Sequence, residues 1–154
     1  MTVFRLLGFL LIFLTLPGLM AAGPGPAHAE DVLPDGCLGN LTDDQVIVYY
    51  FHRKFRCGSC EVIESTLQRA LETYYGPHFT NGRLAMCVVN IDDPANRHYL
   101  EQFQLLSTSL VIVKKSKGSV ARFKHIDSIW EISEDPDAIS HILQTEISRY
   151  LTEG

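Results

Sequence analysis

The sequence predicts an α/β fold in which helices flank a mixed four-stranded sheet. Apolar runs typical of buried strands alternate with segments whose apolar residues recur at helical spacing. The resulting order is strand, helix, strand, helix, strand, strand, helix (βαβαββα), and such alternation favours a sheet covered by helices. One domain, over residues 43–152, is enough to hold these elements.

The first strand and helix are predicted within residues 45–80. Residues 45–52 form a continuous β-branched and aromatic run, as expected of a central strand covered on both faces. From Cys57 onward, apolar residues follow a helical period until Gly76 and Pro77, where the pattern is expected to stop. These residues are Val62, Ile63, Leu67, Ala70 and Leu71.

The next strand and helix are predicted at residues 84–91 and 94–103. The first of these ranges is apolar, and Pro94 stands at a plausible first helical position of the second. Two short strands then follow at 110–113 and 120–124, and the polar residues 114–118 between them are typical of a hairpin connection.

The last predicted element is an amphipathic helix that opens at Asp135 and Pro136. Six apolar residues fall on one stripe of this helix: Ile139, Ile142, Leu143, Ile147, Tyr150 and Leu151. Residues 126–133, which include the single tryptophan, are expected to be irregular.

Residues 1–29 are predicted to be a signal peptide. One positive charge precedes an apolar run over residues 6–20, and Ala27 and Ala29 are small residues at the positions that a signal peptidase reads. Cleavage after Ala29 would release an exported, periplasmic protein. The alternative is a retained membrane anchor, which the helix-breaking residues 23–26 disfavour.

The mature chain would begin with an extension over residues 30–42 and would be acidic. The sequence holds 13 Lys and Arg and 18 Asp and Glu, and Arg5 is the one charged residue before position 30, so 12 basic residues face 18 acids, a net charge of −6. Such a surface repels nucleic-acid phosphates and argues against a nucleic-acid partner. Export would also allow the four cysteines to form lasting disulfides.

Cys57 and Cys60 form a C-x-x-C pair at the start of the predicted helix. A thiol attacks a disulfide only as the thiolate, and a helix N-terminus stabilises an anion. Cys57 is therefore the predicted nucleophile and Cys60 the resolving thiol, with Gly58 and Ser59 between them. The basic residues Arg53, Lys54 and Arg56 are expected to add positive charge nearby. A permanent disulfide, or half of a zinc site, would use the same spacing.

These features resemble the thioredoxin superfamily over nearly all of residues 42–152. The aromatic strand, the C-x-x-C motif at the mouth of a helix and the later hairpin carry the resemblance. More narrowly, Val48–His52 leading into Cys57–Cys60, with Ser107–Val111 before the hairpin, resembles the small exported proteins of the ArsF-family nitroreductase subunits.

The resemblance implies a thiol-disulfide oxidoreductase without an organic cofactor. Its substrate would be a disulfide or dithiol of another protein, and the chain would act as a monomer. The narrower family implies a redox partner in the reduction of nitroaromatic or arsenic compounds, supplied with electrons by a membrane thiol transporter of the CcdA type.

The chain departs from the superfamily pattern at two positions. Tyr50 stands about where thioredoxins carry a buried acid, and Ser109 is the predicted equivalent of their cis-proline. A cis bond before a residue other than proline is costly, so a trans peptide or local strain is expected at Ser109.

Three further residues have more than one possible role: His52, Cys37 and Cys87. His52 is expected to face solvent at the strand end, to donate a proton to the leaving Cys60, or to bind Cu(I) with Cys57 and Cys60 as in a periplasmic metallochaperone. Cys87 lies in an apolar run and Cys37 in the extension. They form a structural disulfide with each other or remain unpaired, and spacing does not decide between these.

Overall fold

The computed structural model describes residues 36–153, so the predicted signal peptide and its cleavage site lie outside the described residues. Within this part the chain forms a five-stranded sheet in the order β1-β3-β2-β4-β5. The strands are β1 (Cys37–Leu38), β2 (Gln45–His52), β3 (Leu84–Asn90), β4 (Ser109–Ser116) and β5 (Ser119–His125). No helix of residues 36–153 has the length and apolarity to cross a membrane.

The strand directions make the sheet mixed, as predicted. The central strand β2 runs parallel to β3 and antiparallel to β4, and β4 pairs with β5 as a hairpin. The four predicted strands are all present in a thioredoxin-like arrangement, which confirms the fold class. The fifth, β1, was not predicted because it has two residues and lies within the expected extension; it pairs antiparallel with β3.

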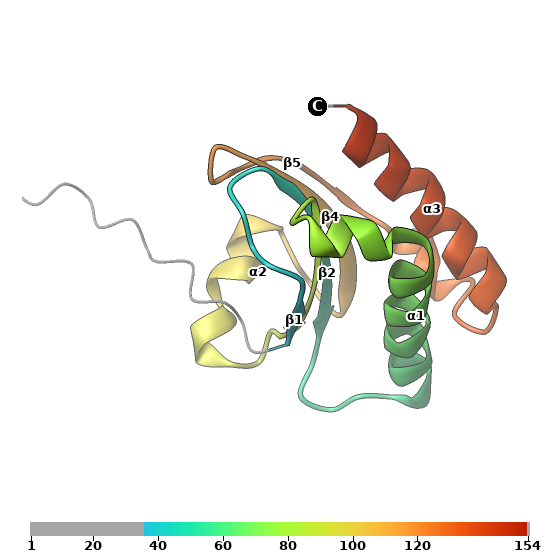
Figure 1. Ribbon diagram of the computed structural model, residues 1–154. Helices are drawn as coiled ribbons and strands as arrows, with labels where there is room; N and C mark the ends of the chain where they lie inside the picture. Colours follow the sequence, from blue (N-terminus) through green and yellow to red (C-terminus); the bar gives the residue numbers. More distant parts are fainter. Residues whose placement is uncertain (1–35, 154) are drawn as a thin grey trace, which may run out of the picture. The chain divides into compact units, whose positions relative to one another are not determined.

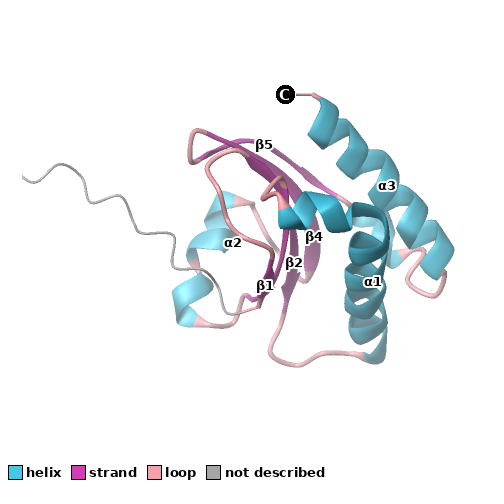
Figure 2. Cartoon of the chain, viewed as in Figure 1, coloured by secondary structure: helices cyan, strands magenta, loops and turns pink. Residues whose placement is uncertain are grey.

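Helices cover both faces of this sheet (Figures 1 and 2). The long helices α1 (Gly58–Thr80) and α3 (Pro136–Thr152) lie together on one face, and α2 (His98–Gln102) lies on the other. Two short 3₁₀ helices, η1 (Pro94–Asn96) and η2 (Asp127–Trp130), complete the elements of the described part.

The central strand β2 supplies side chains to two hydrophobic cores. Val46, Val48 and Tyr50 belong to the core beneath α1 and α3, whereas Ile47, Tyr49 and Phe51 belong to the core on the side of α2. This alternation explains why the whole strand reads as apolar. It also directs Tyr50 toward the helix that carries the C-x-x-C pair.

The prediction that the first helix stops at Gly76–Pro77 is wrong. The helix α1 continues to Thr80, and Figure 1 shows it bending sharply near its C-terminal end. Proline inside a helix costs about 3 kcal/mol and bends it, because one backbone hydrogen bond is lost. Tyr75 and Phe79, on either side of the proline, pack against the core and offset this cost. Val62, predicted to be on the buried stripe, is 44% exposed.

The second helix and the hairpin also differ in extent from the prediction. The range 94–103 divides into η1 and α2. In the hairpin, the residues between the strands are only Lys117 and Gly118, since Lys115 and Ser116 pair with β5. Both turn residues have positive φ, 52° and 76°, as a two-residue type I′ turn requires.

The closing helix is confirmed, with Asp135 as its N-cap and Pro136 at its start. The Asp135 carboxylate accepts hydrogen bonds from the N–H groups of Asp137 and Ala138. The segment predicted as irregular contains η2, whose Ile129 is fully buried.

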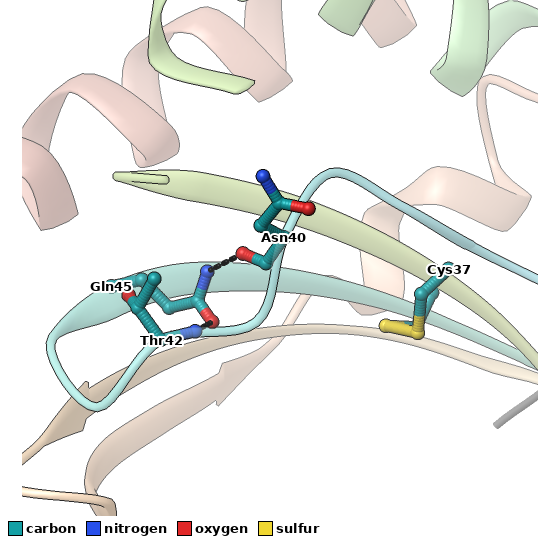
Figure 3. Close-up of a disulfide and its surroundings, with 5 residues drawn as sticks. Cys37, Asn40, Thr42 and Gln45 are labelled. Atoms are coloured by element: carbon teal, nitrogen blue, oxygen red, sulfur yellow. Dashed lines mark hydrogen bonds between the residues drawn. A yellow bond between two sulfur atoms is a disulfide. The ribbon is translucent and has the colours of Figure 1, made fainter. Parts of the chain in front are cut away.

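A disulfide joins the extension to the sheet (Figure 3). Cys37 of β1 is bonded to Cys87, its partner residue on β3, across 50 residues of sequence. Farther along the extension, the buried Gln45 side chain donates to the Asn40 carbonyl at 3.0 Å and accepts from the Thr42 N–H at 2.7 Å. The extension is thereby attached to the start of β2.

Candidate functional site

The C-x-x-C pair lies where the loop after β2 enters α1. Cys57 is the N-cap residue of the helix, and its sulfur accepts a hydrogen bond from the backbone N–H of Cys60 at 3.3 Å. Gly58 and Ser59 are exposed and form the first helical turn between the two cysteines. Both cysteines are free thiols, Cys57 exposed and Cys60 buried.

The two thiols have opposite pKa shifts. Hydrogen bonds from the Cys60 side chain, and then from its backbone N–H, lower the pKa of Cys57. Burial, and then the hydrogen bond to Cys57, raises the pKa of Cys60. A helix N-terminus is a favourable place for an anion, because its N–H groups have no helical partner. Cys57 is therefore the more nucleophilic thiol, and Cys60 is held protonated beside it.

The basic residues of the loop before Cys57 contribute less to the lowered pKa of its thiol than predicted. The Arg53 guanidinium pairs with Asp92 at 2.8 Å, and Arg56 pairs with Glu64 on α1. Both guanidinium groups therefore pair with a carboxylate rather than with Cys57. The lowered pKa of Cys57 is due chiefly to hydrogen bonds within the C-x-x-C turn.

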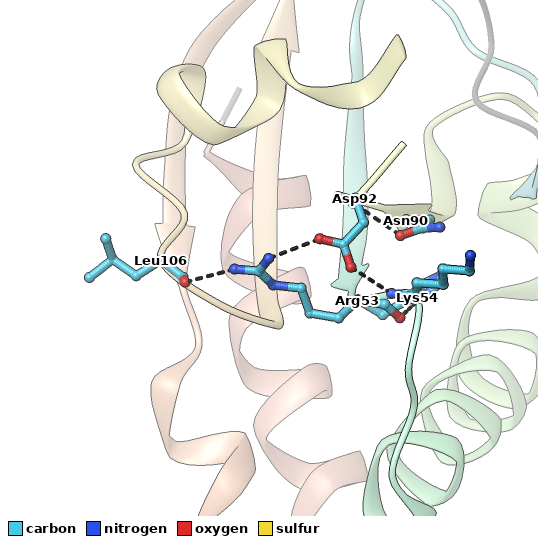
Figure 4. Close-up of polar contacts among 6 residues, drawn as sticks. Arg53, Lys54, Asn90, Asp92 and Leu106 are labelled. Atoms are coloured by element: carbon cyan, nitrogen blue, oxygen red, sulfur yellow. Dashed lines mark hydrogen bonds and ion pairs between the residues drawn. The ribbon is translucent and has the colours of Figure 1, made fainter. Parts of the chain in front are cut away.

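Asp92 connects the loop before Cys57 to the end of β3 (Figure 4). One carboxylate oxygen accepts from Arg53 at 2.8 Å, and the other accepts from the backbone N–H of Lys54 at 2.9 Å. Arg53 also donates to the Leu106 carbonyl at 3.4 Å. Three loops thus meet at one ion pair. Asp92 was not among the predicted site residues; its place directly after the apolar run of residues 84–91 was the available signal.

Tyr50 occupies the interior beneath the cysteine pair. Its side chain is fully buried, and its hydroxyl donates to the Cys60 carbonyl at 3.0 Å. Burial, and then the nearby Cys60, raises the pKa of Tyr50 far above its usual range, so the phenol stays protonated. Tyr50, which the sequence places about where thioredoxins are expected to carry a buried acid, is therefore a hydrogen-bond donor that does not ionise.

Ser109 is the first residue of β4, paired with Phe51 of β2. Its hydroxyl donates to the Ser107 carbonyl at 3.0 Å. No peptide bond within residues 36–153 is cis, so the bond before Ser109 is trans, one of the two expected outcomes.

His52 is not brought into a metal site with the two thiols. Its Nδ1 lies 2.8 Å from the carbonyl oxygen of Arg53. Among residues 36–153, no three His, Cys, Asp or Glu side chains are grouped so that they could hold a metal ion. The predicted Cu(I) ligand set of His52, Cys57 and Cys60 is therefore not formed.

Comparison with known proteins gives similarity to thioredoxins. No protein-family model matches the chain, and no curated protein matches its sequence. Among solved structures, the germline-specific thioredoxin Deadhead of Drosophila melanogaster is 16% identical with a TM-score of 0.43, over 67% of this chain and 82% of that one. Thioredoxin-2 of a malaria parasite, a component of its protein secretion machinery, is 24% identical with a TM-score of 0.42, over 69% of this chain and 88% of that one.

Mitochondrial thioredoxin 3 of Saccharomyces cerevisiae is 14% identical with a TM-score of 0.42, over 69% of this chain and 79% of that one. Because all three TM-scores are below 0.5, the thioredoxin-like fold is assigned from the strand order and directions of the chain itself.

Proposed function

We propose that the protein is a thiol-disulfide oxidoreductase that uses Cys57 and Cys60. The observation that carries this proposal is the asymmetry of the pair: an exposed thiol of lowered pKa at a helix N-cap, and a buried thiol of raised pKa one turn later. Exchange needs one accessible thiolate and a second thiol within bonding reach.

In the reducing direction, the Cys57 thiolate attacks a disulfide of the substrate. A bond forms between Cys57 and one substrate sulfur, and the other sulfur leaves with the electron pair and takes up a proton. Cys60 then loses its proton and attacks the sulfur of Cys57. The Cys57–Cys60 disulfide forms, and the first substrate sulfur leaves as a thiol.

The substrate that we propose is a disulfide or dithiol of another protein. Phe55, two residues before Cys57, is 89% exposed, and an exposed aromatic side chain beside a reactive thiol offers apolar contact area to a polypeptide. The site residues supply this chemistry without an organic cofactor.

The finer assignment follows from the sequence resemblance. We propose that the protein is exported to the periplasm after cleavage behind Ala29, that it acts as a monomer, and that a membrane thiol transporter of the CcdA type keeps it reduced. Its physiological role would be that of the redox subunit of a system that reduces nitroaromatic or arsenic compounds.

A redox titration tests the proposed function. The full chain is equilibrated in a series of glutathione buffers, and the oxidation state of each cysteine is read by thiol labelling and mass spectrometry. We expect Cys57 and Cys60 to titrate together between about −270 and −120 mV, the range from thioredoxin to DsbA. A pair that stays oxidised below about −300 mV would be a structural disulfide and would refute the proposal.

A further inference from the structure

An ion pair between Arg56 and Glu64 lies beside the C-x-x-C turn. Arg56 directly precedes Cys57, and Glu64 lies on α1 four residues after Cys60. Residues four apart are neighbours on one face of a helix, so this carboxylate is on the Cys60 side of α1. Only 26% of the Arg56 side chain and 24% of the Glu64 side chain are exposed. Solvent and salt therefore screen this pair less than a pair at the open surface.

The positive charge of Arg56 reaches the interior beneath the cysteine pair. The Tyr50 hydroxyl, which donates to the Cys60 carbonyl, reports this charge. Burial, and then Cys60, raises the pKa of Tyr50, whereas the Arg56 guanidinium lowers it. An unpaired guanidinium at this place would favour a thiolate at Cys57 for the same electrostatic reason. Glu64 instead provides that guanidinium with a carboxylate.

The stability of the thiolate decides the direction of exchange. A dithiol whose reduced form is stabilised makes a strong oxidant, and one without this stabilisation makes a reductant. The Arg56 charge would favour the reduced form, but Glu64 neutralises it. Asp92 likewise neutralises Arg53, in a pair that is more exposed and therefore more strongly screened. The Arg56–Glu64 pair should thus have the larger effect on the thiols.

We propose that Glu64 sets the reduction potential of the Cys57–Cys60 pair by neutralising Arg56, and that it thereby directs the protein toward reduction of its substrates. This inference rests on the proposed exchange function and adds its direction. In that direction the two thiols lose two protons and give two electrons to a substrate disulfide, which becomes two thiols. Glu64 acts on the reaction through Arg56.

Three variants of the full chain test this inference in the glutathione series. Glu64→Gln leaves the guanidinium unpaired, so the equilibrium constant with glutathione should shift roughly 3- to 10-fold toward the reduced thiols. A tenfold shift corresponds to about 30 mV for this two-electron couple. Arg56→Gln leaves the carboxylate unpaired and should shift the equilibrium toward the disulfide. The double variant should lie close to the unmodified protein, because both charges are removed together.

The opposite signs separate electrostatic tuning from a structural role. A general loss of packing would move the two single variants in the same direction, and this result would overturn the inference. An unchanged potential in Glu64→Gln would also overturn it. Each single variant has its own predicted sign, so either one decides the matter if the other does not fold.

Glu61→Gln is the matched control. Glu61 is exposed in the first turn of the same helix, and its substitution removes the same charge while keeping the Arg56–Glu64 pair. We expect a smaller shift than in Glu64→Gln. Equal shifts would assign the effect to the net charge of the helix and would overturn the role of the pair.

The unmodified protein distinguishes failure of this inference from failure of the proposed function. We expect its potential to lie closer to that of thioredoxin than to that of DsbA. A potential near that of DsbA would leave the exchange function intact and overturn the reducing direction. A Cys57–Cys60 pair that does not titrate with glutathione would refute the exchange function itself.

Discussion

The backbone N–H of Cys60 donates a hydrogen bond to the sulfur of Cys57 at 3.3 Å, so the residue that we propose as the resolving thiol also stabilises a thiolate on the proposed nucleophile. The geometry comes from the N-cap position of Cys57, because an N-cap side chain accepts from an N–H of the first helical turn. Four predictions follow from this site and the elements that hold it.

Alkylation should distinguish the two thiols by pH. The pKa of Cys57 is lowered, so its thiolate fraction, and its rate with iodoacetamide, should reach half of the maximum below the ordinary cysteine pKa of about 8.5. The pKa of Cys60 is raised, so its alkylation should need a higher pH. Mass spectrometry of the alkylated peptides over a pH series measures both. The reverse order would exchange the assigned roles.

Trapping should identify the nucleophile. Cys60→Ser removes the resolving thiol, so a mixed disulfide between Cys57 and a partner protein should accumulate and disappear on reduction. Non-reducing electrophoresis and mass spectrometry detect this complex. Cys57→Ser is the paired variant and should form little or none, because Cys60 is buried. Trapping through Cys60 would contradict the mechanism.

The strands and the C-x-x-C helix start could be predicted because their signals are local. Buried strands read as apolar runs, and two cysteines three residues apart at the head of a helical pattern imply an N-cap sulfur. The continuous apolarity of β2 even indicated that both of its faces are covered, as the alternation of Tyr49 and Tyr50 between two cores shows.

The features that were missed depend on contacts between distant segments. Strand β1 is two residues long and exists through its pairing and disulfide with β3. The helix α1 continues beyond Pro77 because Tyr75 and Phe79, on either side of it, pack against the core. Local helix propensity does not include such tertiary contacts. The loop charge at Arg53 is balanced by Asp92, 39 residues away, so counting basic residues near Cys57 overstated their effect on its pKa.

Removing the structural disulfide should lower stability without altering exchange. We expect Cys37→Ala with Cys87→Ala to reduce the free energy of unfolding by about 2–4 kcal/mol. Without the bond, the unfolded chain is no longer closed into a loop across 50 residues of sequence, so the unfolded state gains entropy. Urea denaturation measures this. With 5,5′-dithiobis(2-nitrobenzoate) as a small disulfide substrate, attack by Cys57 releases a first thionitrobenzoate and attack by Cys60 a second. Both phases of thionitrobenzoate release should match the unmodified protein, since the Cys37–Cys87 bond lies on β1 and β3. A loss of either phase would show that the bond supports the site.

Asp92 should make the stability of the loop before Cys57 depend on pH. Its pKa is lowered first by the hydrogen bond from the Lys54 N–H and then by Arg53, so the folded state favours the carboxylate. The contribution should therefore be complete above the unfolded pKa of about 3.9 and be lost as pH falls through the lower folded value. Asp92→Asn should have a lower denaturation midpoint at neutral pH, and the difference should shrink in acid.

The neighbouring residue provides the control for this effect. Asp93→Asn alters a carboxylate that accepts from Ala95 at the start of η1, away from Arg53. It should leave the rate of the first thionitrobenzoate release unchanged, whereas Asp92→Asn should alter that rate because the loop that presents Cys57 loses its ion pair. If the two variants gave the same rate, the loop would hold its position without the Asp92 charge. A stability difference that persisted unchanged to low pH would likewise assign the effect to the hydrogen-bond geometry instead of the charge.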